Sequence, residues 1–68
     1  MELDQIIIKR IEQYIITNDI SLSKLAKESR IPYHRLWAIF NQSNTIKLGD
    51  YIAICRAFKE PLDFFIPN

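Results

Sequence analysis

Apolar residues recur along the chain at spacings of three and four positions, the period of an α-helix with one buried face. The first such stretch predicts a helix over residues 4–17, and its stripe consists of Leu3, Ile7, Ile11 and Tyr14. Charged and polar residues fall on the opposite side of this helix. The residues that follow, Thr17 to Asp19, favour a turn.

Two shorter helices are predicted in the middle of the chain. Ser21 is a good N-cap, so the second helix is expected from there to about Ser29. Ile31 precedes Pro32 and is therefore pushed out of the helical region, whereas Pro32 suits the first turn of a third helix over residues 32–41. Leu36, Ile39 and Phe40 form the inward face of that third helix.

The C-terminal third predicts two more helices. The fourth runs from Lys47 or Leu48 to Phe58, and a short fifth helix opens at Pro61, with Leu62 and Phe65 pointing to the core. The stripe of the fourth helix is Leu48, Tyr51, Ile52, Cys55 and Phe58. The fold class is therefore all-α, a compact five-helix domain over residues 1–68. The predicted core is Ile11, Leu25, Ala26, Ile31, Leu36, Ile39, Tyr51, Cys55, Phe58 and Phe65.

Length and composition exclude most other architectures. The chain has 68 residues, 49% of them hydrophobic and 25% charged, which is too short for a barrel or a doubly wound sheet. With one cysteine (Cys55) and one histidine (His34), we expect no internal disulfide, no metal and no cofactor. We expect a cytoplasmic protein, since no apolar run approaches a membrane span and Glu2 and Asp4 do not suit a signal peptide.

The net charge of +1 conceals an uneven distribution. Residues 20–49 hold five cationic side chains and one acidic side chain, whereas the two ends together hold four cationic and seven acidic side chains. A basic centre between acidic ends predicts an anionic partner.

The second and third helices are separated by so few residues that they must cross, as in a helix-turn-helix. The residues Leu25-Ala26, Ile31, Leu36, Ile39 and Asn41 resemble the helix-turn-helix of the phage repressor and Cro-type family, also called the XRE family. Further downstream, Tyr51, Ile54-Cys55, Ala57-Phe58 and residues 62–66 resemble the last two helices of that family. The similarity covers about residues 11–66. Arg30 stands where the family usually has a glycine in the turn.

This resemblance implies a small sequence-specific regulator of transcription that inserts helix 32–41 into the major groove of double-stranded DNA. The residues that match base-facing positions are Tyr33, His34 and Ala38. Candidate phosphate ligands are Ser21, Ser23, Arg35, Asn41, Ser43, Asn44, Thr45 and Lys47. Relatives bind as two-fold pairs, so we expect a weak homodimer completed on DNA. Its candidate contacts are Phe64, Ile66 and Pro67, with Ile6 or Ile8 as the alternative.

A second function class fits the same residues. A protein-binding module of a mobile element, acting as an antirepressor or inhibitor, would use Tyr33 and Trp37 as anchors, since exposed aromatic pairs are frequent hot spots of protein interfaces. Trp37 lies at the core edge, against the DNA backbone or against a partner; the sequence leaves all three open. An enzyme is not expected, because no nucleophile–base pair and no phosphate-binding loop is found. A steep salt dependence of duplex binding distinguishes the first class from the second.

Overall fold

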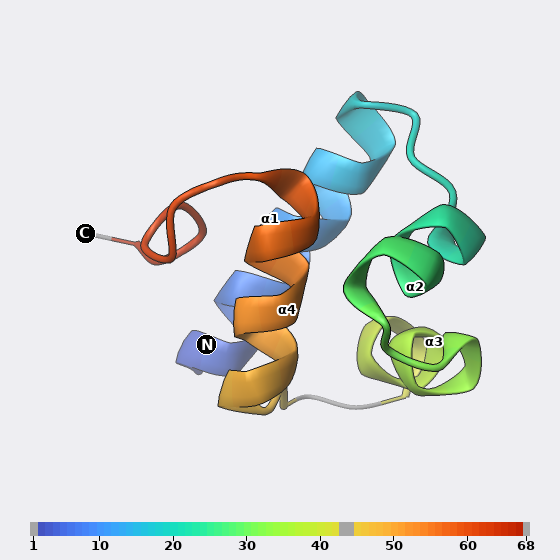
Figure 1. The fold of residues 1–68 in the computed structure, drawn as a ribbon. Helices are drawn as coiled ribbons and strands as arrows, with labels where there is room; N and C mark the ends of the chain where they lie inside the picture. The colour runs from blue at the N-terminus through green and yellow to red at the C-terminus, as the bar shows by residue number, and fades with distance from the viewer. Residues whose placement is uncertain (1, 43–44, 68) are drawn as a thin grey trace.

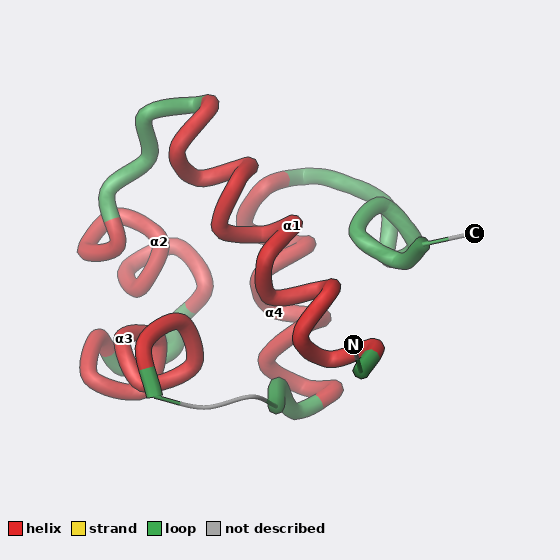
Figure 2. Tube along the Cα trace, turned by 180° about the vertical axis from the view of Figure 1, so that it is seen from behind, coloured by secondary structure: helices red, strands yellow, loops and turns green. Residues whose placement is uncertain are grey.

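The computed structural model describes residues 2–42 and 45–67, in which all regular secondary structure is helical. The helices are α1 (Leu3–Thr17), α2 (Leu22–Ser29), α3 (Tyr33–Asn41) and α4 (Leu48–Phe58). In Figures 1 and 2, α2 and α3 lie on one side of α1 and α4, and the C-terminal segment (residues 59–67) lies on the other side. Within these ranges, no helix is long and apolar enough to cross a membrane.

Local signals set the helix boundaries where the sequence predicted them. The Ser21 hydroxyl accepts a hydrogen bond from the backbone N–H of Lys24 at 3.1 Å, which confirms Ser21 as the N-cap of α2. Arg30 ends α2 in the left-handed conformation, with φ 64°. Pro32 then precedes the first residue of α3. The loop before α4 is tied to α1, because the Ile46 N–H donates to the Asp4 carboxylate at 3.2 Å.

The core lies where α1, α2, α3 and α4 meet, and most of its members were predicted. Eight predicted members are buried: Ile11, Leu25, Ile31, Leu36, Ile39, Tyr51, Cys55 and Phe65. Ala26 and Phe58 are half-buried and pack against this cluster. Ile7, Ile8 and Ile54 are also buried. Leu3 and Leu48, which the periodicity placed on buried stripes, are exposed because they stand at helix ends, beyond the reach of the core.

The predicted fifth helix is wrong. Residues 62–65 form turns. Two isolated hydrogen bonds of the i+3 to i type are present, from the Phe64 N–H to the Pro61 carbonyl and from the Ile66 N–H to the Asp63 carbonyl. The Leu62 carbonyl accepts a hydrogen bond from the Tyr51 hydroxyl. This bond fixes the segment against α4 in a non-helical path. Phe65 is buried as predicted, but the Leu62 side chain is 52% exposed, so its predicted inward orientation is also wrong.

Two buried titratable groups of α4 are held in their neutral forms. Burial raises the pKa of Tyr51 to about 12, mainly because the ionised phenolate would be poorly hydrated there. Burial also raises the pKa of the Cys55 thiol. A buried thiol held protonated is a poor nucleophile, so Cys55 acts as a small apolar core residue.

Candidate nucleic-acid interface

The outer face of α3 carries the predicted base-reading residues. Tyr33 and His34 are exposed at its first turn, and Ala38 is half-buried one turn further on. Leu36 and Ile39 point into the core and fix the rotation of the helix. At about 100° per residue, Tyr33, His34 and Ala38 lie within an arc of about 140° on the outer face.

Trp37 lies inside that arc and is 43% exposed, beside Tyr33 at 50%. The structure therefore places Trp37 on the outer face of the helix and not within the core. Asn41 belongs to the same face, but its side-chain amide donates to the Trp37 carbonyl at 2.9 Å and thus holds the last turn of α3. Trp37 was not among the predicted base-reading residues, although the helical period alone places it between Tyr33 and Asn41 around the helix axis.

Four predicted DNA-contacting residues come together in one depression between α3 and the start of α4. It has a volume of about 200 Å³. Its lining residues are Arg35, Ala38, Ile39, Thr45, Lys47 and Asp50. Ser21 and Ser23 lie at the start of α2 and do not line this depression. Ser43 and Asn44 fall outside the described residues.

An ion pair that the sequence analysis missed occupies this depression. The Arg35 Nη2 atom lies 2.5 Å from the Asp50 Oδ1 atom, and the Asp50 side chain is only 10% exposed whereas that of Arg35 is 50% exposed. Asp50 follows directly after the basic segment of residues 20–49, so a charge count along the chain treats it as part of the acidic ends. In space it neutralises one of the five cations of that segment.

Of the other four cations of that segment, three lie on or directly after α2, and Lys47 is the N-cap of α4. Lys24, Lys27 and Arg30 are all exposed on or directly after α2. The N-cap residue of α3 is Pro32, whose side chain makes no capping hydrogen bond, so the backbone N–H groups of the first turn and the positive end of the helix dipole lie beside Tyr33 and His34. An anion approaching this end of α3 is favoured by the helix dipole and by the nearby cations.

The candidate dimer residues lie away from α3. Phe64 and Ile66 are 46% and 42% exposed, and Pro67 is half-buried. All three belong to the C-terminal segment, on the far side of α1 and α4 from α3 (Figures 1 and 2). The alternative contact through Ile8 is wrong, because Ile8 is buried in the core; Ile6 is half-buried.

No family model, no curated protein and no solved structure matches the chain. Among residues 2–42 and 45–67, no three His, Cys, Asp or Glu side chains are grouped so that they could hold a metal ion.

Proposed function

We propose that the protein is a small sequence-specific DNA-binding regulator of transcription, in which α2 and α3 form a helix-turn-helix and α3 enters the major groove. The observation that carries the proposal is the outer face of α3, where polar and aromatic side chains are exposed beside the exposed cations of α2. An α-helix fits the major groove, and side chains at its exposed N-terminal end can reach base edges. A regulator of this kind acts in the cytoplasm.

In this proposal the side chains of α3 have separate roles. His34 donates a hydrogen bond to a guanine, Tyr33 offers its hydroxyl, and Ala38 offers a methyl contact to thymine. Lys47 and Arg35 contribute charge toward the phosphates from the depression between α3 and α4, which sets affinity but reads no sequence. Arg35 does so while paired with Asp50, so its contribution is smaller than that of an unpaired arginine.

We also propose that two copies pair weakly through Phe64, Ile66 and Pro67 and that the pair is completed on DNA. One helix in one groove specifies too few base pairs to find a site in a genome. The exposure of Phe64 and Ile66 supports this contact. Two-to-one cooperative binding to a palindrome is expected, and Phe64→Ala should remove the cooperativity.

The test is selection of bound sequences from a random duplex library, followed by binding titrations over a range of salt. An enriched sequence is expected, and His34→Ala should relax preference at one base pair by ~1–3 kcal/mol. Lys47→Ala should weaken all sequences equally and reduce the salt slope by about one. Lys9→Ala is the matched control, because Lys9 lies on α1 and does not line the α3 depression. If His34→Ala lowers the affinity for the selected and the random duplex equally, His34 does not read a base.

A second candidate function is a protein-binding module that uses the same face. The exposure of Trp37 and Tyr33 and the neutralisation of Arg35 by Asp50 favour it. If this second function is correct, no duplex sequence is enriched at low salt, and the affinity for duplex DNA changes little with salt concentration.

A further inference from the structure

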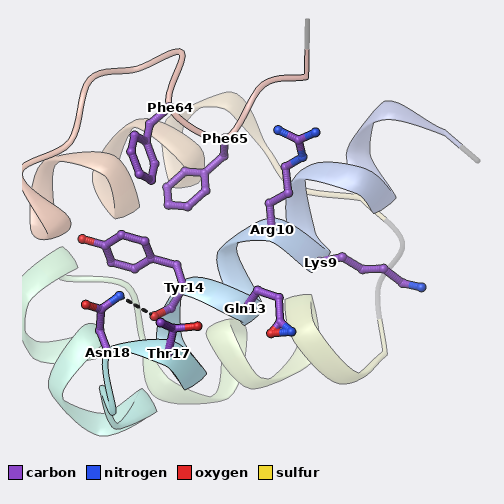
Figure 3. Close-up of a pocket in the computed structure, with 8 residues that line it drawn as sticks. All are labelled: Lys9, Arg10, Gln13, Tyr14, Thr17, Asn18, Phe64 and Phe65. Atoms are coloured by element: carbon purple, nitrogen blue, oxygen red, sulfur yellow. Dashed lines mark hydrogen bonds between the residues drawn. The ribbon is translucent and has the colours of Figure 1, made fainter.

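A groove on the opposite side of the molecule from α3 combines cations with an aromatic floor that the proposed DNA contacts do not use. It lies between α1 and the C-terminal segment and has a volume of about 440 Å³. Its lining residues are Lys9, Arg10, Gln13, Tyr14, Thr17, Asn18, Phe64 and Phe65. Figure 3 shows Phe64 and Phe65 approaching the Tyr14 ring from the C-terminal segment, with Arg10 beside them and Lys9 extending outward.

The floor of the groove is aromatic and firmly held. The Tyr14 ring centroid lies 4.5 Å from that of Phe58, 5.7 Å from Phe64 and 5.5 Å from Phe65. The Tyr14 hydroxyl donates to the Glu60 carboxylate at 2.9 Å, which fixes the ring from its far end. Phe65 is buried, but Phe64 remains nearly half exposed. The groove therefore offers a preformed apolar surface.

The charged part of the lining is exclusively positive. Lys9 and Arg10 are both exposed, and neither makes an ion pair within the described parts of the chain. No carboxylate lines the groove. The remaining polar side chains, from Gln13 to Asn18, lie along α1 and can hydrogen-bond to a peptide backbone.

We propose that this groove docks a short acidic-apolar peptide segment of a partner protein. The length of α1 from Lys9 to Asn18 is about 13 Å, at 1.5 Å per residue, which equals about four extended residues at ~3.3 Å each. Arg10 and Tyr14 are one helical turn apart, about 6 Å, which matches two residues of an extended chain. The preferred peptide thus carries an aspartate or glutamate two positions from a phenylalanine or leucine.

The charge and shape of the groove favour such a peptide over the other occupants. Double-stranded DNA would gain from the two cations, but its sugar–phosphate backbone would gain nothing from the aromatic floor. A second copy of this chain cannot supply an extended segment from its own acidic-aromatic stretch, because Phe65 is fixed in the core and Tyr51 holds the Leu62 carbonyl. The groove shares no residue with the α3 face, so its test is independent of base reading, but it shares Phe64 with the proposed homodimer contact, so a peptide and a second copy would compete there.

The test is selection from a random dodecapeptide phage library on the full chain without DNA, followed by fluorescence anisotropy with one enriched, fluorescein-labelled peptide. Enriched peptides should carry the acidic residue two positions from the aromatic or aliphatic one. Arg10→Glu and Phe64→Ala should each weaken binding at least tenfold, and circular dichroism should show both variants folded. Lys24→Glu on α2 is the matched charge control and should leave the affinity unchanged.

Three outcomes overturn the proposal. One is the absence of acidic-apolar peptides among those enriched. Another is binding that Arg10→Glu leaves unchanged, which places the peptide elsewhere. The third is self-association in sedimentation that Arg10→Glu weakens while no peptide is enriched, which makes a second copy the occupant.

Discussion

Replacing Arg30 with glycine should stabilise the protein, because Arg30 holds a conformation that L-residues with a side chain avoid. Its φ is 64° and its ψ is 21°. Two hydrogen bonds hold the turn in this conformation. The Arg30 N–H donates to the Ala26 carbonyl at 2.9 Å, and the Ile31 N–H donates to the Ser29 hydroxyl at 3.3 Å. No ion pair or hydrogen bond of the Arg30 side chain is found among the residues that the structure describes.

The expected gain follows from two opposing terms. A left-handed residue with a Cβ costs ~1–2 kcal/mol, which glycine does not incur. Glycine also gives the unfolded chain more freedom, which offsets ~0.4–1 kcal/mol of the gain. The net stabilisation is therefore ~0–1.6 kcal/mol, and the midpoint of about 0.8 kcal/mol corresponds to roughly 3–6 °C in melting temperature for a chain of this size.

Thermal and urea unfolding followed by far-ultraviolet circular dichroism measures the difference. Arg30→Ala is the matched control, because it removes the same side chain and keeps the Cβ, so its stability should lie below that of Arg30→Gly. Lys59 ends α4 with φ 60° and ψ 36°, so Lys59→Gly should reproduce the effect at a second site. A lower melting temperature for Arg30→Gly than for Arg30→Ala would refute the argument from backbone strain.

Three further substitutions test the core, the buried phenol and the ion pair. Leu36 is fully buried, so Leu36→Ala should cost ~2–5 kcal/mol and unfold much of so small a domain; an unchanged melt would contradict the core assignment. Tyr51 keeps its proton to about pH 12 in the folded state, whereas the unfolded chain releases it near pH 10. Through Tyr51, stability should therefore fall by up to about 2–3 kcal/mol as the pH rises from 10 to 12. Tyr51→Phe should reduce this dependence in alkaline urea titrations and leave the part due to Tyr14 and Cys55, whose pKa values are also raised. Asp50→Asn should free Arg35 and, on the proposed function, steepen the salt slope of duplex binding by about one; an unchanged slope would mean that Arg35 does not meet a phosphate.

The helices were predictable because their signals are local. The Ser21 cap, the Ile31-Pro32 step and the three-and-four periodicity each act within a few residues, and the boundaries followed to within one or two positions. The prediction of the fifth helix was wrong because the path of the C-terminal segment depends on how it packs against α4, outside the segment itself. The Tyr51 hydroxyl takes the Leu62 carbonyl, and nothing near Leu62 in the sequence indicates this bond.

The candidate site shows the same division between local and distant information. The helical period of α3 is sufficient to expose Tyr33, His34 and Trp37 together. The depression beside α3 was only partly foreseeable, because it depends on how the start of α4 meets Arg35. The groove of Figure 3 joins α1 to residues about fifty positions later, so no pattern along the chain could reveal it.

The Arg35–Asp50 pair links the proposed function to the architecture. It joins the first turn of α3 to the first turn of α4. The Asp50 carboxylate reduces the positive field of the Arg35 guanidinium but also fixes the orientation of that group. A phosphate that reaches Arg35 would therefore meet a weaker but preoriented partner. On the proposed function, the salt slope of Asp50→Asn therefore measures how much of the Arg35 charge this carboxylate withholds from a phosphate.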